Sequence, residues 1–125
     1  MQTQNIAIVG LNEMGTEFFK GMINLKEKGV NVVSVCERVF TEGTQLAQEK
    51  GIQNLSLENL VELGEVIDII FDLSNNRNIR KELRKHLFST NNQHTVIAPE
   101  SVARLMYTMI SEDALPGDTN LHSGY

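Results

Sequence analysis

The 125-residue sequence predicts an α/β domain with a doubly wound parallel sheet. Short apolar segments alternate along the chain with segments whose apolar residues recur at helical spacing. The short segments are almost continuously apolar, which is typical of strands buried on both faces of a sheet. Gly10 directly follows the first of them and allows a tight turn into a helix. These three observations predict about five parallel strands with helices on both faces.

The first half of the chain predicts three strands, each followed by a helix. Gly29 and Gly51 stand where two of these helices are expected to end in left-handed caps. Thr41 and Ser56 stand where side-chain hydroxyls are expected to cap helix N-termini. The strands are expected at residues 5–9, 31–36 and 52–55, and the helices at residues 14–28, 41–50 and 56–63.

The second half predicts two more strands and two more helices. Residues 66–73 form its most apolar strand, and a fifth strand covers residues 94–98. Between them, residues 76–88 have the spacing of a helix with one apolar face. Pro99 is expected in the first turn of the last helix, where its missing N–H group costs little.

Few strand orders are compatible with this alternation, because crossovers between parallel strands are right-handed. We expect the order 3-2-1-4-5. A flavodoxin-like order, 2-1-3-4-5, is the alternative. The tight glycine turn after the first strand favours the first order, because flavodoxin-like receivers usually carry acidic residues there.

Composition limits the possible functions. The net charge of −5 argues against a general nucleic-acid-binding protein. Cys36 is the only cysteine, which excludes an intramolecular disulfide and fits a reducing cytoplasm. No apolar run approaches the roughly 20 residues that span a bilayer, and the N-terminus lacks the features of a signal peptide. We therefore expect one cytoplasmic domain over residues 1–112, without a membrane partner, and a flexible tail over residues 113–125.

Four segments carry a resemblance to known nucleotide-binding domains: IAIVGLNEMG, VVSVCE, VIDIIFDLSNN and HTVIAPESVARLMYTMI. The chain resembles the N-terminal Rossmann domain of NAD(P)-dependent oxidoreductases of the glucose-fructose oxidoreductase and inositol dehydrogenase type. It is still more similar to the small Rossmann-like domains at the N-terminus of some bacterial sensor histidine kinases. Over residues 5–112, the resemblance implies a Rossmann fold and an NAD(P) cofactor.

The first segment is close to the glycine-rich fingerprint that holds a dinucleotide pyrophosphate. Asn12 replaces the middle glycine; it can adopt a left-handed conformation, but its side chain fills part of the space. Glu13 places a carboxylate where a helix N-terminus attracts phosphate. Whether the loop still binds a dinucleotide is therefore open. The cofactor-binding residues expected here are Gly10, Leu11, Asn12, Glu13, Met14 and Gly15.

Glu37 is the best support for a cofactor. It ends the second strand, where an acidic residue of the family accepts hydrogen bonds from the adenosine ribose. The alternative is an acidic side chain that faces water at a strand end. Arg38 follows and could recognise a 2′-phosphate, so NADP stays possible, although Glu37 favours NAD.

A polar turn follows the fourth strand, at the edge of the sheet where doubly wound folds bind ligands. Ser74, Asn75 and Asn76 are the cofactor-binding candidates there. Asn75 or Asn76 could instead cap the next helix. Asp72 interrupts the apolar strand, and we expect its carboxylate to accept hydrogen bonds from loop amides.

The helix at residues 76–88 carries a basic stripe. Such a stripe is usually a solvated face, and a docking surface for an acidic partner is the alternative. Its members are Arg77, Arg80, Lys81, Arg84 and Lys85.

The histidines and the cysteine show no metal-ligand spacing, and no catalytic residues can be identified. The sequence therefore favours a regulatory or sensory domain that binds NAD(P) or another adenine nucleotide. One alternative is the cofactor-binding half of an oxidoreductase whose substrate domain is separate. The other is a degenerate Rossmann scaffold that binds no nucleotide and acts through protein contacts.

The last helix predicts a homodimer, because no second domain is expected to cover its broad apolar face. The residues expected on that face are Val102, Leu105, Met106, Met109 and Ile110, with Tyr107 alongside.

Overall fold

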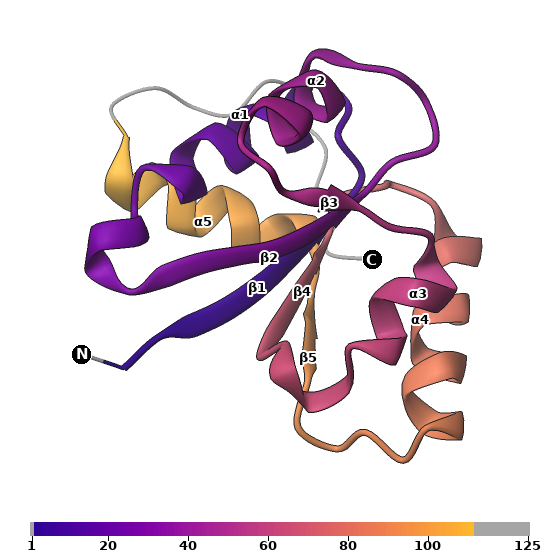
Figure 1. The fold of residues 1–125 in the computed structure, drawn as a ribbon. Coiled ribbons are helices and arrows are strands. Elements are labelled where there is room, and N and C mark those ends of the chain that lie inside the picture. The colour runs from indigo at the N-terminus through magenta and orange to yellow at the C-terminus, as the bar shows by residue number, and fades with distance from the viewer. Residues whose placement is uncertain (1, 112–125) are drawn as a thin grey trace.

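The computed structural model describes residues 2–111, which form a five-stranded, all-parallel sheet with helices on both faces (Figure 1). The strand order is β3-β2-β1-β4-β5, which confirms the predicted order and excludes the flavodoxin-like alternative. The strands are β1 (Gln4–Val9), β2 (Val30–Cys36), β3 (Gln53–Asn54), β4 (Ile69–Asp72) and β5 (Val96–Ala98). The predicted tail, residues 113–125, lies outside the described residues.

Five α-helices and two short 3₁₀ turns connect and cover the strands. The helices are α1 (Glu13–Ile23), α2 (Glu42–Glu49), α3 (Leu57–Glu62), α4 (Arg77–Ser89) and α5 (Glu100–Ile110). The 3₁₀ turns are η1 (Lys26–Lys28) and η2 (Gly64–Val66). No helix among the described residues is both long enough and apolar enough to cross a membrane.

The sheet separates two apolar cores (Figure 1). Helices α1, α2 and α5 cover one face, where Phe18 of α1 packs on Phe71 of β4 with ring centroids 4.8 Å apart. Helices α3 and α4 cover the other face through Leu60 and Leu83, both fully buried. Strands buried on both faces explain why the sequence shows continuous apolar runs instead of alternation.

Helix α1 ends at Ile23, so the helix predicted to continue through residue 28 is too long. The amide of Leu25 donates to the carbonyl of Met22, three residues back, which tightens the chain into 3₁₀ geometry before η1. Gly29 then adopts a left-handed φ of 95°, as predicted.

For two strands, the predicted first residue lies too early in the sequence. Strand β4 begins at Ile69 instead of residue 66, because Gly64 has a φ of 67° and starts the η2 turn that includes Val66. Strand β5 begins at Val96 instead of residue 94. The side chain of Asn92 accepts the amides of His94 and Thr95 in a turn, which keeps them out of the ladder.

Helix N-termini follow the capping predictions closely. The hydroxyl of Thr41 accepts the Thr44 amide at 3.2 Å, and the hydroxyl of Ser56 accepts the Asn59 amide at the same distance. Pro99 stands one position earlier than predicted, at the N-cap of α5 and not in its first turn. Its ring fixes φ, at −80°, before the helix begins.

Helix α5 exposes fewer of its apolar residues than predicted. Met106 and Tyr107 are partly buried and pack against the core under α1, so the prediction that they face outward is wrong. The exposed apolar residues are Val102 (38%), Leu105 (63%), Met109 (71%) and Ile110 (44%).

Candidate functional site

The glycine turn between β1 and α1 owes its shape to missing side chains. Gly10 has a φ of 98°, and a Cβ there would lie 2.7 Å from the backbone of Leu73 and Ser74. A Cβ on Gly15 would overlap the carbonyl oxygen of Gly10. Both positions therefore require glycine, and the polar turn after β4 packs directly against this loop.

Asn12 caps helix α1. Its φ and ψ are −68° and −169°, so the left-handed conformation considered for it is wrong. Its side-chain oxygen accepts the Gly15 amide at 2.8 Å, and its side-chain nitrogen donates to the Leu73 carbonyl at 3.4 Å. A short polar side chain thus satisfies one helix amide and ties the loop to the end of β4.

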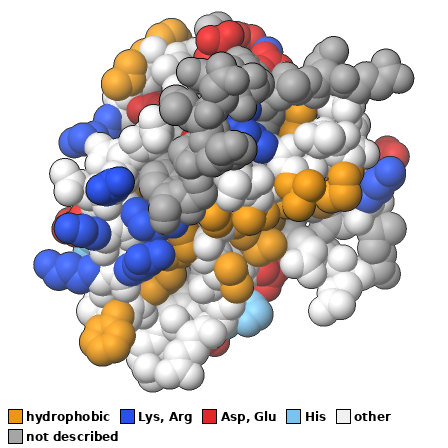
Figure 2. Space-filling model, turned by 180° about the vertical axis from the view of Figure 1, so that it is seen from behind, with side chains coloured by type: hydrophobic (Ala, Val, Ile, Leu, Met, Phe, Trp, Pro, Cys, Tyr) orange, Lys and Arg blue, Asp and Glu red, His pale blue; other side chains and the backbone are white. Residues whose placement is uncertain are grey.

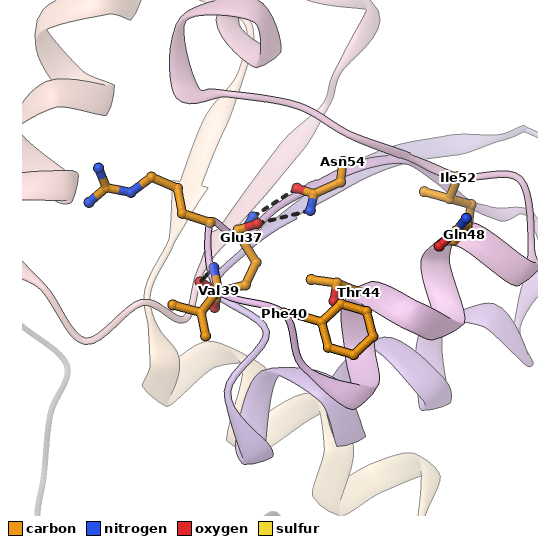
Figure 3. Close-up of a pocket in the computed structure, with 8 residues that line it drawn as sticks. Glu37, Val39, Phe40, Thr44, Gln48, Ile52 and Asn54 are labelled. Carbon is orange, nitrogen blue, oxygen red and sulfur yellow. Dashed lines mark hydrogen bonds between the residues drawn. The ribbon is translucent and has the colours of Figure 1, made fainter.

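Glu37 is tied to the glycine loop. Its carboxylate accepts the Leu11 amide at 2.9 Å and the Val39 amide at 3.2 Å, so backbone groups hold it at the end of β2. The side-chain amide of Asn54 makes two hydrogen bonds of 2.9 Å to the backbone of Glu37 (Figure 3). The sequence did not indicate the contacts of Glu37 with Leu11 and Asn54, because these contacts form only when β1, β2 and β3 pair.

Two backbone amides in the first turn of α1 have no hydrogen-bond acceptor within the part of the chain that the structure describes. The backbone N–H groups of Glu13 and Met14 donate to no group among residues 2–111. Such amides, together with the helix dipole, attract anions. They remain available although Asn12 and Glu37 occupy the amides on either side.

A small acidic hollow of about 170 Å³ lies beside this turn. Its carboxylates come from Glu13, Glu17 and Glu42. Lys20 bridges two of them, at 2.6 Å from Glu42 and 3.3 Å from Glu17, and these hydrogen bonds raise the pKa of Lys20. The lysine offsets part of the negative charge. The hollow is lined by Leu11, Asn12, Glu13, Thr16, Glu17, Thr41 and Glu42.

A larger hollow of about 390 Å³ has Glu37 in its lining (Figure 3). Its volume is near the lower end for small-molecule sites. Phe40 is 76% exposed and presents a ring, while Thr44 and Gln48 offer hydrogen-bonding groups. Arg38 also lines this hollow. The full lining is Glu37, Arg38, Val39, Phe40, Thr44, Gln48, Ile52 and Asn54.

The turn after β4 is built around a buried ion pair. Asp72 accepts the Nε of Arg80 at 2.9 Å, and it also accepts the amide and hydroxyl of Ser74 at 3.1 and 2.6 Å. The prediction that Asp72 binds a loop amide is confirmed. Arg80 is buried, so its predicted place in an exposed basic stripe is wrong.

Asn75 and Asn76 shape the start of α4. Asn75 has a φ of 55°, and Asn76 caps the helix by accepting the Asn78 amide at 2.9 Å. Neither asparagine, nor Ser74, is among the described residues that line the two hollows. The structure therefore ties Glu37 to residues 10–15 through the Leu11 amide, and it packs Leu73 and Ser74 against the glycine loop.

Cys36 stands beside Glu37 at the end of β2. Burial, and then the charge of Glu37, raise the pKa of its thiol to about 11. The side chain therefore stays a neutral thiol at physiological pH. Among the described residues, no three His, Cys, Asp or Glu side chains are placed to hold a metal ion.

Comparison with known proteins gives structural neighbours only. No family model and no curated protein matches the sequence. The crystal structure of S. aureus homoserine dehydrogenase at pH 7.0 aligns with a TM-score of 0.56 and 16% identity over 90% of this chain and 31% of that one. The structure of the same enzyme at pH 6.5 aligns with a TM-score of 0.54 and 13% identity, over 90% of this chain and 30% of that one. The chain thus spans about a third of the length of these neighbours.

The strand order and this likeness establish a Rossmann-like α/β domain over residues 2–111. At such low identity the likeness shows the fold alone. The more specific resemblances, to glucose-fructose oxidoreductase-type enzymes and to domains of sensor histidine kinases, stay predictions.

Proposed function

We propose that this chain is a Rossmann-like domain that binds NAD and has a regulatory or sensory role. The observation that carries the proposal is the position of Glu37. Its carboxylate ends β2, contacts the glycine loop through the Leu11 amide, and borders the larger hollow. This is where a ribose acceptor is needed in a dinucleotide-binding Rossmann domain.

The residues at this edge fit the parts of a dinucleotide. The amides of Glu13 and Met14, which have no acceptor among residues 2–111, would bind phosphate oxygens. Each carboxylate oxygen of Glu37 accepts one backbone amide and retains capacity for a ribose hydroxyl. Phe40 would provide a stacking surface for adenine. Arg38 lines the same hollow and keeps NADP as the alternative cofactor.

The acidic hollow weakens this site. Glu13, Glu17 and Glu42 raise the free energy of a bound pyrophosphate, and Lys20 offsets only part of that effect. We therefore expect weak binding, with a Kd between about 0.1 and 1 mM. Such a site would respond to changes in the concentration of an abundant nucleotide, which suits a sensor.

A second candidate function is the cofactor-binding part of an oxidoreductase. The two homoserine dehydrogenase structures that align with the chain support it, since the chain matches only about a third of their length. A third candidate is a scaffold that binds no nucleotide. The internal capping of the loop by Asn12 and Glu37 supports that alternative.

We propose that the domain works as a homodimer through α5. Val102, Leu105 and Met109 are exposed and recur at intervals of three and four residues, the spacing of a helix–helix seam. Leu105→Glu should shift sedimentation equilibrium from dimer to monomer. Val66→Glu is the control, because Val66 is 57% exposed in η2, away from α5. A monomer at high concentration without any substitution would contradict the proposal.

Calorimetric titration with NAD, NADH, NADP and AMP tests the nucleotide site. We expect NAD to bind, and Glu37→Gln to weaken it by about tenfold, because a ribose acceptor is lost. Absence of heat with every nucleotide up to about 5 mM would reject nucleotide binding and support the scaffold alternative.

Glu13→Gln tests the charge at the loop. Removing this carboxylate should tighten NAD binding by about threefold to tenfold, since the phosphate no longer meets a like charge. Glu58→Gln is the matched control, because Glu58 stands in the first turn of α3, away from the glycine loop. Equal affinities of the Glu13 variant and the unmodified protein would show that this charge does not limit binding.

A further inference from the structure

Helix α4 carries an exposed basic stripe that ends in an exposed phenylalanine. We define the α4 stripe as Arg77, Lys81, Arg84, Lys85 and Phe88. The four basic side chains are exposed, and Phe88, at 88%, is the most exposed of the large apolar side chains within residues 2–111. Figure 2 shows several Lys and Arg side chains gathered on the side of the molecule on which α4 lies.

None of the four basic residues has an ion-pair partner among the described residues. Arg80, on the same helix, is instead buried against Asp72. The only acidic residue of α4 is Glu82, and it lies 3.6 Å from His86. The stripe therefore presents positive charge that the fold does not neutralise.

The basic residues of the stripe lower the local stability of α4. Arg77 and Lys81, and then Lys81 and Lys85, are like charges four residues apart, each pair costing about 0.2–0.5 kcal/mol. Arg77 is also the first residue of α4, whose first turn has no acidic residue, so it meets the positive end of the helix dipole. Residues that oppose local stability are expected at functional positions.

We propose that the α4 stripe docks an acidic helical segment of a protein partner. The stripe extends for about 16 Å, or three helical turns. Its partner would carry carboxylates at matching intervals and one apolar residue to cover Phe88. The net charge of −5 disfavours a nucleic-acid partner, because a long polyanion would meet the acidic remainder of the surface.

This surface is separate from the proposed nucleotide site. Helices α3 and α4 cover one face of the sheet, and α1, whose first turn forms the glycine loop, covers the other. The docking proposal therefore does not depend on nucleotide binding. Arg77 nevertheless follows the turn that packs against the glycine loop, so a docked partner would lie near the ligand-binding edge.

A labelled helical peptide of about 14 residues tests the proposal, with glutamates spaced three and four apart and one leucine. Fluorescence anisotropy would be measured at about 50 and 300 mM salt. We expect Lys81→Glu with Lys85→Glu to weaken binding at least about tenfold. Phe88→Ala should weaken it about threefold at both salt concentrations, because its contribution is apolar.

Lys26→Glu with Lys28→Glu is the matched control, since these exposed residues of η1 change the net charge equally. This control should change affinity less than about twofold, and circular dichroism should show every variant folded. Three results would each overturn the proposal. They are an equal loss in the control, no binding of the peptide at about 1 mM, or equally tight binding of single-stranded or duplex nucleic acid.

Discussion

Two turns at the same edge of the sheet connect a central strand to a helix by different physical means. The β1–α1 turn is determined by absent side chains: Gly10 and Gly15 leave room for backbone that would otherwise clash. The β4–α4 turn is determined by charge, because Asp72 is fully buried and holds both Arg80 and Ser74. The two turns pack on each other, since a Cβ on Gly10 would meet the Ser74 backbone.

The two turns also differ in how many of their polar groups the fold itself uses. In the β4–α4 turn both oxygens of Asp72 already accept hydrogen bonds, so its polarity serves the fold. In the β1–α1 turn the amides of Glu13 and Met14 remain without a partner among the described residues. A ligand is therefore expected at the glycine turn, with the second turn acting as its rigid support.

The largest expected effect comes from breaking the ion pair. Asp72→Ala should lower the free energy of unfolding by about 3–5 kcal/mol, because the Arg80 guanidinium would stay buried without its carboxylate. Urea unfolding measures the change. Adding Arg80→Met to this variant should recover much of the loss. If the double variant were no more stable than Asp72→Ala alone, the ion pair would not be what determines the β4–α4 turn.

A smaller loss is expected from filling the glycine turn. Gly15→Ala should cost about 2–3 kcal/mol, because the new methyl group overlaps the Gly10 carbonyl oxygen and neither backbone can move freely. Gly21→Ala, in the interior of the same helix, is the control. Its Cβ would lie 3.1 Å from a Tyr107 side-chain atom that can shift, and alanine favours the helix. Equal thermal shifts for the two variants would contradict a steric role for Gly15.

The smallest effect is expected from the helix cap. Asn12→Ala should cost about 1 kcal/mol, and Asn12→Gly only a few tenths, because both remove the acceptor for the Gly15 amide but glycine suits an N-cap. Chemical denaturation distinguishes these values. If Asn12→Ala were as damaging as Asp72→Ala, the first turn would depend on side chains as strongly as the second.

Much of the fold could be read from the sequence, because its causes are local. Gly29, Thr41 and Ser56 end or begin elements as predicted, since a left-handed residue and a capping hydroxyl act on their immediate neighbours. Strand beginnings were less accurate. Val66 and Ile67 are apolar enough for a strand, but the η2 turn that begins at Gly64 uses their backbone. The backbone amides of His94 and Thr95 are likewise taken by the side chain of Asn92.

The sequence did not show how the candidate site residues contact one another, nor that Phe40, Thr44 and Gln48 line the hollow beside Glu37. The sequence placed Glu37 at the end of a strand, and its bond to the Leu11 amide depends on the pairing of β1 with β2. The sequence analysis grouped Arg80 with the exposed basic residues of the helix. Helical spacing alone does not show that the Arg80 side chain turns inward and pairs with Asp72.

The sequence by itself determined the α/β class, the strand order and the need for glycine at residues 10 and 15. Apolar runs, helical spacing and chain chirality are sufficient for these, since they act through local geometry and simple burial. Only the tertiary structure decided which polar groups are used internally and which remain available. Hydrogen bonds and ion pairs depend on contacts between segments far apart in the chain. They are fixed only once the sheet has assembled.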